Sequence, residues 1–143
     1  MLCEGNDECM FATVFLGVLD LTSNRFTYVN GGHDIPLIKR GDNFDWLPVK
    51  PALMPGFLPG TKYEQEETVL KKGDVLFLYT DGVTEAENPG REQLTEERLK
   101  SIVNECDLIS AKELLNFTRI KVDEFADGAE QFDDITMLAL KIE

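Results

Sequence analysis

The sequence predicts an α+β domain in which short β-strands come first, two helices follow and one last strand closes the fold. Segments rich in β-branched and aromatic residues recur up to residue 79, apolar residues take helical spacing from about residue 95 to 125, and residues 135–140 form a final apolar run. Such segregation of strands and helices along the chain is typical of the α+β class. With 143 residues, 43% of them hydrophobic, the chain is long enough for one core.

The first strands are predicted as antiparallel segments joined by turns. Residues 11–19 are almost continuously apolar, which predicts a strand buried on both faces. Turn residues at 20–25 and a β pattern at 26–29 predict that this strand belongs to a hairpin. Further short strands are expected at residues 35–40 and at 44–47, the latter at a sheet edge.

A proline-rich segment separates these strands from the next pair. Residues 48–60 carry Pro at positions 48, 51, 55 and 59 and Gly at 56 and 60, which excludes a regular helix or a central strand and predicts a structured loop. Residues 63–70 then predict a strand, and residues 75–79 predict a buried one.

Two amphipathic helices are expected next. Thr95 is the predicted N-cap of the first, because it stands directly before two glutamates. Ser110 and Glu113 form a predicted capping box at the start of the second, and apolar residues follow at helical spacing. A polar loop at 127–131 leads into the last strand.

The net charge of the chain restricts the kinds of ligand that it is expected to bind. Lys and Arg total 14 against 27 Asp and Glu, so the net charge is −13 at pH 7. An acidic surface repels phosphate backbones and anionic lipid, which argues against nucleic-acid binding and against a membrane-surface role. Carboxylates are instead the ligands that hard divalent cations prefer.

The chain also lacks the signals of other classes. No apolar run approaches the roughly 18–20 residues of a membrane span, and the first eight residues have no signal-peptide pattern. Cys3, Cys9 and Cys106 form no Cys-x-x-Cys pair, which favours reduced thiols in the cytoplasm, with Cys106 as a core residue. A zinc site is not expected, because His33 is the only histidine and stands far from the cysteines in sequence.

Three segments contain residues that could carry chemistry, although each has an ordinary structural explanation. A buried strand ends at Asp81-Gly82, which would place a carboxylate ligand at the end of a rigid strand. Asp-Gly after a strand is also common in turns, and a turn is the better explanation of this segment taken alone. Asp133 and Asp134 precede the last strand, where they either meet a cation or point to solvent. Gly-Gly before His33 allows a close backbone approach, yet a lone loop histidine is more often structural.

Together these segments resemble the SpoIIE/RsbU branch of the PP2C-type, metal-dependent serine/threonine protein phosphatases. The resemblance rests on residues 11–21, 28–37, 73–86 and 130–137, which follow the family's order and spacing. The third of these segments holds the Asp-Gly signature and the fourth holds the Asp-Asp-x-Thr motif. The resemblance covers essentially the whole chain.

The resemblance implies a PP2C-like sandwich of two antiparallel sheets with flanking helices and a site for two Mn²⁺ or Mg²⁺ ions. It implies that a metal-bound water attacks the phosphorus of phosphoserine or phosphothreonine, so no side chain is named as the nucleophile. By match to the family's motifs, Asp81 and Asp133 are the expected metal ligands. Four more residues are expected near the site without an assigned role: Gly82, Asp134, Asn30 and His33.

One departure from the family pattern affects the metal site. Family members begin with a Gly-Asp-x-x-Asp segment and a Gly-Asp-Val-x-Gly segment, which supplies the carboxylate that bridges both metals, and neither occurs in this sequence. We therefore expect residues 1–143 to be a single SpoIIE-type domain without its N-terminal strands. Weak metal binding and homo-oligomers through exposed sheet edges are expected consequences.

Two functions stay open at this point. The first is a cytoplasmic phosphatase in sigma-factor or stress signalling that acts on a phosphorylated STAS-type anti-sigma antagonist, as the resemblance implies. The second is a catalytically inactive fragment or pseudophosphatase that serves as a binding or regulatory module. An unrelated Mg²⁺-binding protein with the same carboxylates is disfavoured by the number of matching segments.

Overall fold

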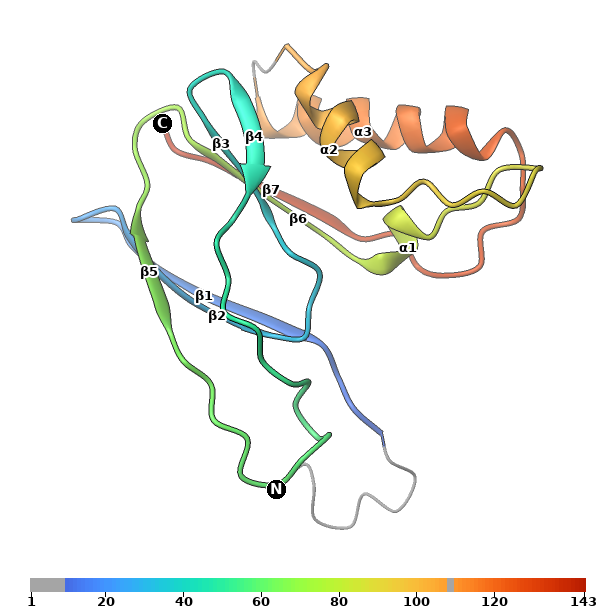
Figure 1. Cartoon of the computed structure of the whole chain (residues 1–143). Helices are drawn as coiled ribbons and strands as arrows, with labels where there is room; N and C mark the ends of the chain where they lie inside the picture. The colour runs from blue at the N-terminus through green and yellow to red at the C-terminus, as the bar shows by residue number, and fades with distance from the viewer. Residues whose placement is uncertain (1–9, 108–109) are drawn as a thin grey trace. The chain divides into compact units, whose positions relative to one another are not determined.

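The computed structural model describes residues 10–107 and 110–143, which belong to two compact units (Figure 1). The first unit comprises Met1–Ile35 and Pro48–Lys71, and its described part contains a three-stranded sheet. The second unit comprises Pro36–Leu47 and Lys72–Glu143, and its described part contains a four-stranded sheet and helices. Both sheets are antiparallel, as the sequence predicts.

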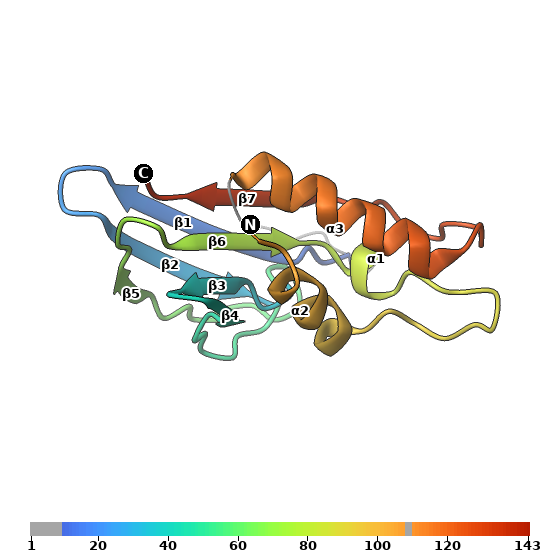
Figure 2. The same ribbon diagram turned by 90° about the horizontal axis from the view of Figure 1, so that it is seen from above.

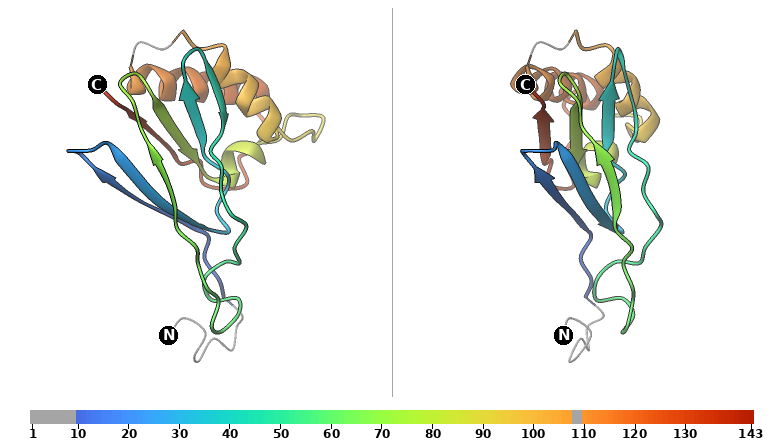
Figure 3. Two further views of the ribbon diagram at one scale, coloured as in Figure 1. Left: turned by 60° about the vertical axis from the view of Figure 1, so that its left-hand side comes forward. Right: turned by 90° about the vertical axis from the view of Figure 1, so that its left-hand side faces the viewer.

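The first unit is built on the predicted hairpin. Strands β1 (Val14–Asp20) and β2 (Arg25–Gly31) pair with each other, and β5 (Glu66–Val69) pairs with the other edge of β2 (Figure 3). The rings of Phe26 and Tyr28, on one face of β2, stack with their centroids 5.2 Å apart. The segment 48–60 is irregular, as its prolines predict.

The burial predicted for β1 is wrong. The strand begins at Val14 rather than residue 11, and Val14, Leu16 and Val18 on one of its faces are 41%, 63% and 64% exposed. Within the described residues β1 has a strand partner only in β2, so it lies at a sheet edge. The apolar run therefore reflects β-propensity and an uncovered sheet face, which a sequence pattern cannot distinguish from burial.

We expect this edge strand to mediate self-association. A long apolar edge strand is a template for pairing with another chain, and a lysine on it interferes with that pairing. The substitution Leu16→Lys should therefore shift the mass measured by sedimentation equilibrium toward the monomer. The control Leu21→Lys, at a residue 83% exposed just after β1, should leave the mass unchanged. An unmodified chain that stays monomeric at every concentration would contradict the prediction.

The sheet of the second unit has the strand order β4-β3-β6-β7. Strands β3 (Leu37–Arg40) and β4 (Asn43–Trp46) form a hairpin with β4 at the edge, as predicted. Strand β6 (Val75–Tyr79) lies between β3 and β7 (Met137–Lys141). The prediction of a buried strand at residues 75–79 is confirmed, since four of its five residues are at most 3% exposed: Val75, Leu76, Phe77 and Tyr79.

Helices cover one face of this sheet (Figure 2). The short helix α1 (Asp81–Thr84) follows β6 directly, while α2 (Glu96–Asn104) packs against β4 and α3 (Ala111–Ala126) packs against β7. Helices α2 and α3 also contact each other. Fully buried side chains of both helices and of the sheet form one core, among them Leu37, Phe77, Leu99, Val103 and Leu114.

The two longer helices begin at the predicted N-caps, with different chemistry. Ser110 Oγ accepts a hydrogen bond from the Glu113 N–H and donates one to the Glu113 carboxylate, at 3.2 and 2.9 Å. Thr95 stands at the N-cap of α2, but its side chain makes no capping hydrogen bond. Its φ of 70° departs from the extended conformation in which a side chain usually caps a helix.

Cys106 is a core residue, as predicted. It is 8% exposed, and burial raises the pKa of its thiol, so the reactive thiolate is suppressed. The predictions for Cys3 and Cys9 lie outside the described residues.

In the described part of the chain, no helix has both the length and the apolar character needed to cross a membrane.

Candidate metal site at the end of strand β6

The end of β6 and the segment before β7 meet at one end of the second unit's sheet. The two strands are antiparallel, with Tyr79 opposite Met137, so the residues after β6 lie beside those before β7. The Thr80 N–H continues the ladder by donating to Thr136 O at 3.0 Å. The register therefore brings the Asp81-Gly82 motif to the Asp133-Asp134 motif.

The hydroxyl of Thr80 joins the two segments. Thr80 Oγ1 donates to Asp134 O at 2.9 Å and accepts from the Thr136 N–H at 3.0 Å. Sequence reasoning missed this residue. Its signal was the hydroxyl between a buried strand and an Asp-Gly pair, where a side chain can bond to the backbone of a neighbouring segment.

Gly82 allows the two backbones to touch. A Cβ built on Gly82 would lie 2.5 Å from Asp134 O and 3.2 Å from Asp133 O, which are backbone atoms that cannot swing away. Gly82 thus lies against the backbone of Asp133 and Asp134, while its expected place near a metal ion stays a prediction. The glycine is required because a side chain would separate the segments that carry the acids.

The turn expected at Asp81-Gly82 is present, since the Val83 N–H donates to Thr80 O at 2.9 Å, but it continues as a helical turn. Asp81 begins the helical turn α1, in which the Glu85 N–H donates to Asp81 O at 2.8 Å. Val83 within this turn is fully buried in the core. Burial of Val83 stabilises a helical turn that local propensity alone does not predict.

Both expected metal ligands are exposed, and one carboxylate oxygen of each already accepts a backbone hydrogen bond. Asp81 Oδ1 accepts the Gly82 N–H at 2.9 Å, and Asp133 Oδ1 accepts the Asp134 N–H at 2.7 Å. Gln131 Nε2 donates to Asp133 O at 2.7 Å and supports the loop; sequence reasoning missed this contact too. The second carboxylate oxygen of each aspartate has no hydrogen-bond or ion-pair partner among the described residues.

The chemistry of these donors fits a hard divalent cation. Mg²⁺ and similar ions prefer carboxylate oxygen and usually keep several waters, with one or two carboxylates from the protein. Asp81 and Asp133 can supply that number. Among the residues that the structure describes, no group of three or more His, Cys, Asp or Glu is arranged to hold a metal. The donor set therefore fits one hydrated ion better than an enclosed pair.

Asn30 and His33 lie in the first unit and contact each other. Asn30, 8% exposed, donates from Nδ2 to His33 O and accepts the His33 N–H at Oδ1, both at 2.8 Å. His33 Nδ1 lies 2.9 Å from Asp34 O, a distance that suits a hydrogen bond donated by this ring nitrogen to the carbonyl. The pair closes the loop after β2. Its proximity to the carboxylates stays a prediction.

The chain is similar in sequence to a family model and to curated proteins, one of which is a phosphatase. The family model described as Stage II sporulation protein E (SpoIIE) matches residues 1–143. Protein IcfG of Synechocystis is 31% identical over 137 residues, which cover 96% of this chain and 22% of IcfG. Phosphoserine phosphatase RsbU of Bacillus subtilis is 28% identical over 144 residues, which cover 94% of this chain and 40% of RsbU. The chain thus spans less than half the length of these curated relatives.

Solved structures share the fold. The PP2C phosphatase domain of B. subtilis SpoIIE, solved with a fragment of its regulatory domain, matches with a TM-score of 0.80 at 21% identity over 99% of this chain and 42% of that one. The RsbU and RsbW domains of Rv1364c from Mycobacterium tuberculosis match with 0.73 at 27% identity, over 95% and 37%. These matches confirm the predicted PP2C-like class. With a family model that spans every residue, the chain belongs to the SpoIIE family of PP2C-like phosphatase domains.

Proposed function

We propose that this chain forms part of a metal-dependent protein serine/threonine phosphatase, with Asp81 and Asp133 as ligands of Mn²⁺ or Mg²⁺. The observation that carries the proposal is the backbone contact between Gly82 and the 133–134 segment, which keeps two exposed carboxylates on adjacent segments. Each aspartate has one oxygen held by a backbone N–H and one without a partner among the described residues. The backbone hydrogen bond orients each carboxylate, and its second oxygen remains available to a cation.

The role of the chain's own residues is to position these ligands. The Gly82 and Asp134 N–H groups orient the two carboxylates, and Thr80 ties the segments together. A divalent ion bound there would polarise a phosphoryl oxygen and lower the pKa of its bound water. Solved relatives support the choice of ion, since one SpoIIE phosphatase structure is described as Mn presoaked and an RsbX structure as a complex with magnesium.

The proposed substrate is a phosphorylated protein, specifically a STAS-type anti-sigma antagonist in cytoplasmic sigma-factor or stress signalling. It is supported by the similarity to a phosphoserine phosphatase and to a protein that joins RsbU and RsbW domains. We also propose that both units belong to one SpoIIE-type domain over residues 1–143. The proposal includes Asn30 and His33 as residues near the site.

Mn²⁺-dependent release of phosphate from p-nitrophenyl phosphate tests the proposal. Asp81→Asn and Asp133→Asn should each lower the rate by more than ~100-fold, since even residues behind a metal ligand are commonly worth 10–100-fold. Asp42→Asn is the matched control, because it changes an exposed acid in the β3–β4 turn at the opposite end of the sheet. Equal rates of phosphate release by Asp81→Asn and by the unmodified chain would contradict the role of Asp81 as a metal ligand in catalysis.

The alternative function, a non-catalytic binding or regulatory module, is favoured by one observation. Within the described residues, Asp81 and Asp133 are not joined by a third acidic, His or Cys residue in a metal-binding arrangement. Calorimetric titration with Mn²⁺ separates the two functions. Tight binding of two ions per chain would contradict the module, whereas a folded chain that takes up no Mn²⁺ would contradict the phosphatase.

A further inference from the structure

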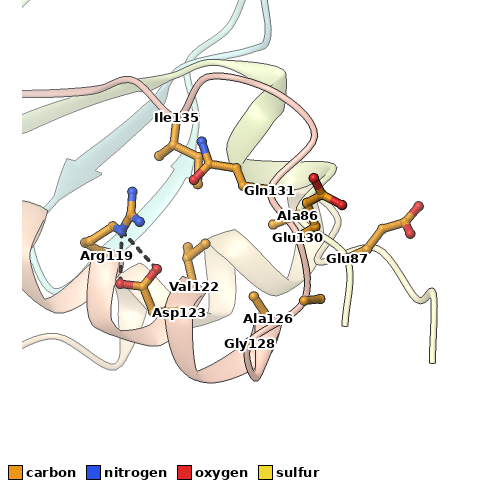
Figure 4. Close-up of a pocket in the computed structure, with 11 residues that line it drawn as sticks. Ala86, Glu87, Arg119, Val122, Asp123, Ala126, Gly128, Glu130, Gln131 and Ile135 are labelled. Carbon is orange, nitrogen blue, oxygen red and sulfur yellow. Dashed lines mark hydrogen bonds and ion pairs between the residues drawn. The ribbon is translucent and has the colours of Figure 1, made fainter. Parts of the chain in front are cut away.

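Two neighbouring cavities lie beside the candidate metal site on the second unit, and together we call them the groove. A cavity of about 90 Å³ lies beside the site and is lined by Gly82, Asp133 and the exposed Phe132, among others. A second cavity of about 240 Å³ lies between α3 and the segment 128–135 (Figure 4). Three residues line both cavities: Ala86, Glu87 and Gln131. The two cavities are therefore adjacent on the protein surface.

The larger cavity combines an apolar lining with acidic side chains. Val122, only 1% exposed, and the half-buried Ala126 and Ile135 supply apolar surface. In Figure 4, Val122 and Ala126 from α3 lie across the cavity from Ile135. At about 240 Å³ the cavity falls below the size of most cofactor pockets, so it suits a single side chain.

The charge of the larger cavity is negative. Arg119, which lines it, is already paired with Asp123 one helical turn away, with Nε 3.0 Å from the carboxylate. Glu87 and Glu130 also line it, and neither side chain has a hydrogen-bond or ion-pair partner among the described residues. Two uncompensated carboxylates thus accompany the apolar lining.

We propose that the larger cavity binds a lysine or arginine side chain of the phosphoprotein, a few residues from the phosphoserine or phosphothreonine. The inference rests on the proposed function. Lysine and arginine place an aliphatic stem on apolar surface while the charged head stays at the rim, which matches this combination of Val122, Ile135 and the two glutamates. Opposite charge also selects against acidic segments, which the groove repels.

Phe132 gives the groove a second contact for the substrate. Its side chain is 75% exposed and directly precedes Asp133. Aromatic residues, Phe among them, are enriched where proteins contact their partners, compared with the rest of the protein surface. We place the peptide backbone near the phosphoresidue against this ring, with the basic side chain reaching past Gln131 into the larger cavity.

Two synthetic phosphoserine peptides that differ only by lysine or glutamate near the phosphoserine test the proposal. The unmodified chain with Mn²⁺ should show a kcat/KM about tenfold higher for the lysine peptide, the size expected for two partly exposed charge contacts together with burial of the stem. The double variant Glu87→Lys/Glu130→Lys should lose or reverse this preference. Its rate with p-nitrophenyl phosphate, which has no peptide, is the reference for the peptide rates and corrects for any change at the metal site, because Glu87 also lines the smaller cavity.

A charge-matched control excludes a long-range effect. Asp42→Lys/Glu105→Lys makes the same change in charge at exposed residues that line neither cavity, and it should keep the preference for lysine. A control that loses the preference equally would overturn the proposal. So would an unmodified chain that treats both peptides alike.

A binding measurement separates this proposal from the proposed function. Fluorescence anisotropy with labelled, unphosphorylated forms of the two peptides reports on the groove without catalysis. Tighter binding of the lysine peptide, lost in Glu87→Lys/Glu130→Lys, supports the groove even if the chain hydrolyses no phosphate. Equal binding of both peptides by a chain that does release phosphate would overturn the groove and leave the phosphatase standing.

Discussion

Gly82→Ala is expected to lower the free energy of unfolding by about 1–3 kcal/mol, the usual cost of forcing a methyl group into a packed site. The new Cβ would lie 2.5 Å from Asp134 O, so α1 and the 133–134 segment would have to separate. The sign is informative, because replacing glycine by alanine inside a helix ordinarily stabilises by about 0.5–1 kcal/mol. Urea unfolding followed by circular dichroism measures the change.

The same substitution should also weaken Mn²⁺ binding, because it moves Asp81 away from Asp133. Calorimetric titration measures that loss, provided the variant is still folded at the temperature used. Gly90→Ala is the matched control, since the atom nearest to its added Cβ is Asn88 Oδ1, at 3.1 Å, which belongs to a side chain rather than to the backbone. A Gly82→Ala chain as stable as Gly90→Ala would show that the backbones do not touch.

Thr80→Val is expected to lower stability by about 0.5–1.5 kcal/mol, the usual net contribution of an intramolecular hydrogen bond, because it removes the partner of two exposed backbone groups in the segment before β7. The hydroxyl donates to Asp134 O and accepts from the Thr136 N–H, whereas valine has the same shape but can do neither. Mn²⁺ affinity should fall by about 10–100-fold, as it commonly does when residues that orient metal ligands are lost. Urea unfolding and calorimetric titration measure the two effects.

Thr136→Val provides the comparison for Thr80→Val. Thr136 lies on the adjacent segment, is exposed and bonds to Thr80 through its backbone rather than its side chain. The chemical change is identical, so Thr136→Val should affect stability and Mn²⁺ affinity little. Equal effects of the two substitutions would mean that loss of any hydroxyl at this end of the sheet, rather than the Thr80 bridge, causes the change.

Much of the secondary structure of the second unit could be predicted from local sequence. The continuous apolar run of β6 indicates a central strand, and the Ser110–Glu113 capping box marks the start of α3 because its hydrogen bonds join residues three apart. Strand β1 shows the limit of this reasoning. Its apolar run predicts burial, but only the number of neighbouring strands and the covering of each face decide exposure.

Some residues of the candidate site could also be predicted from the sequence, and others could not. Asp81 and Asp133 could be selected from sequence because their motifs resemble those of a known family. Thr80 and Gln131 could not, because their contribution is a hydrogen bond to a backbone carbonyl of the 133–134 segment. The sequence does not show which backbone carbonyl a side-chain hydroxyl or amide will bond to.

By itself, the sequence determined the α+β class, the central strand, the helix starts and the pair of acidic motifs, since each depends on residues close together in the chain or on a family pattern. Only the tertiary structure decided that Asp81 opens a helical turn, that Gly82 lies against the Asp134 backbone and that Thr80 bridges to the facing segment. The reason is physical: these contacts follow from the register of β6 against β7, which is set by packing of the whole sheet and its helices.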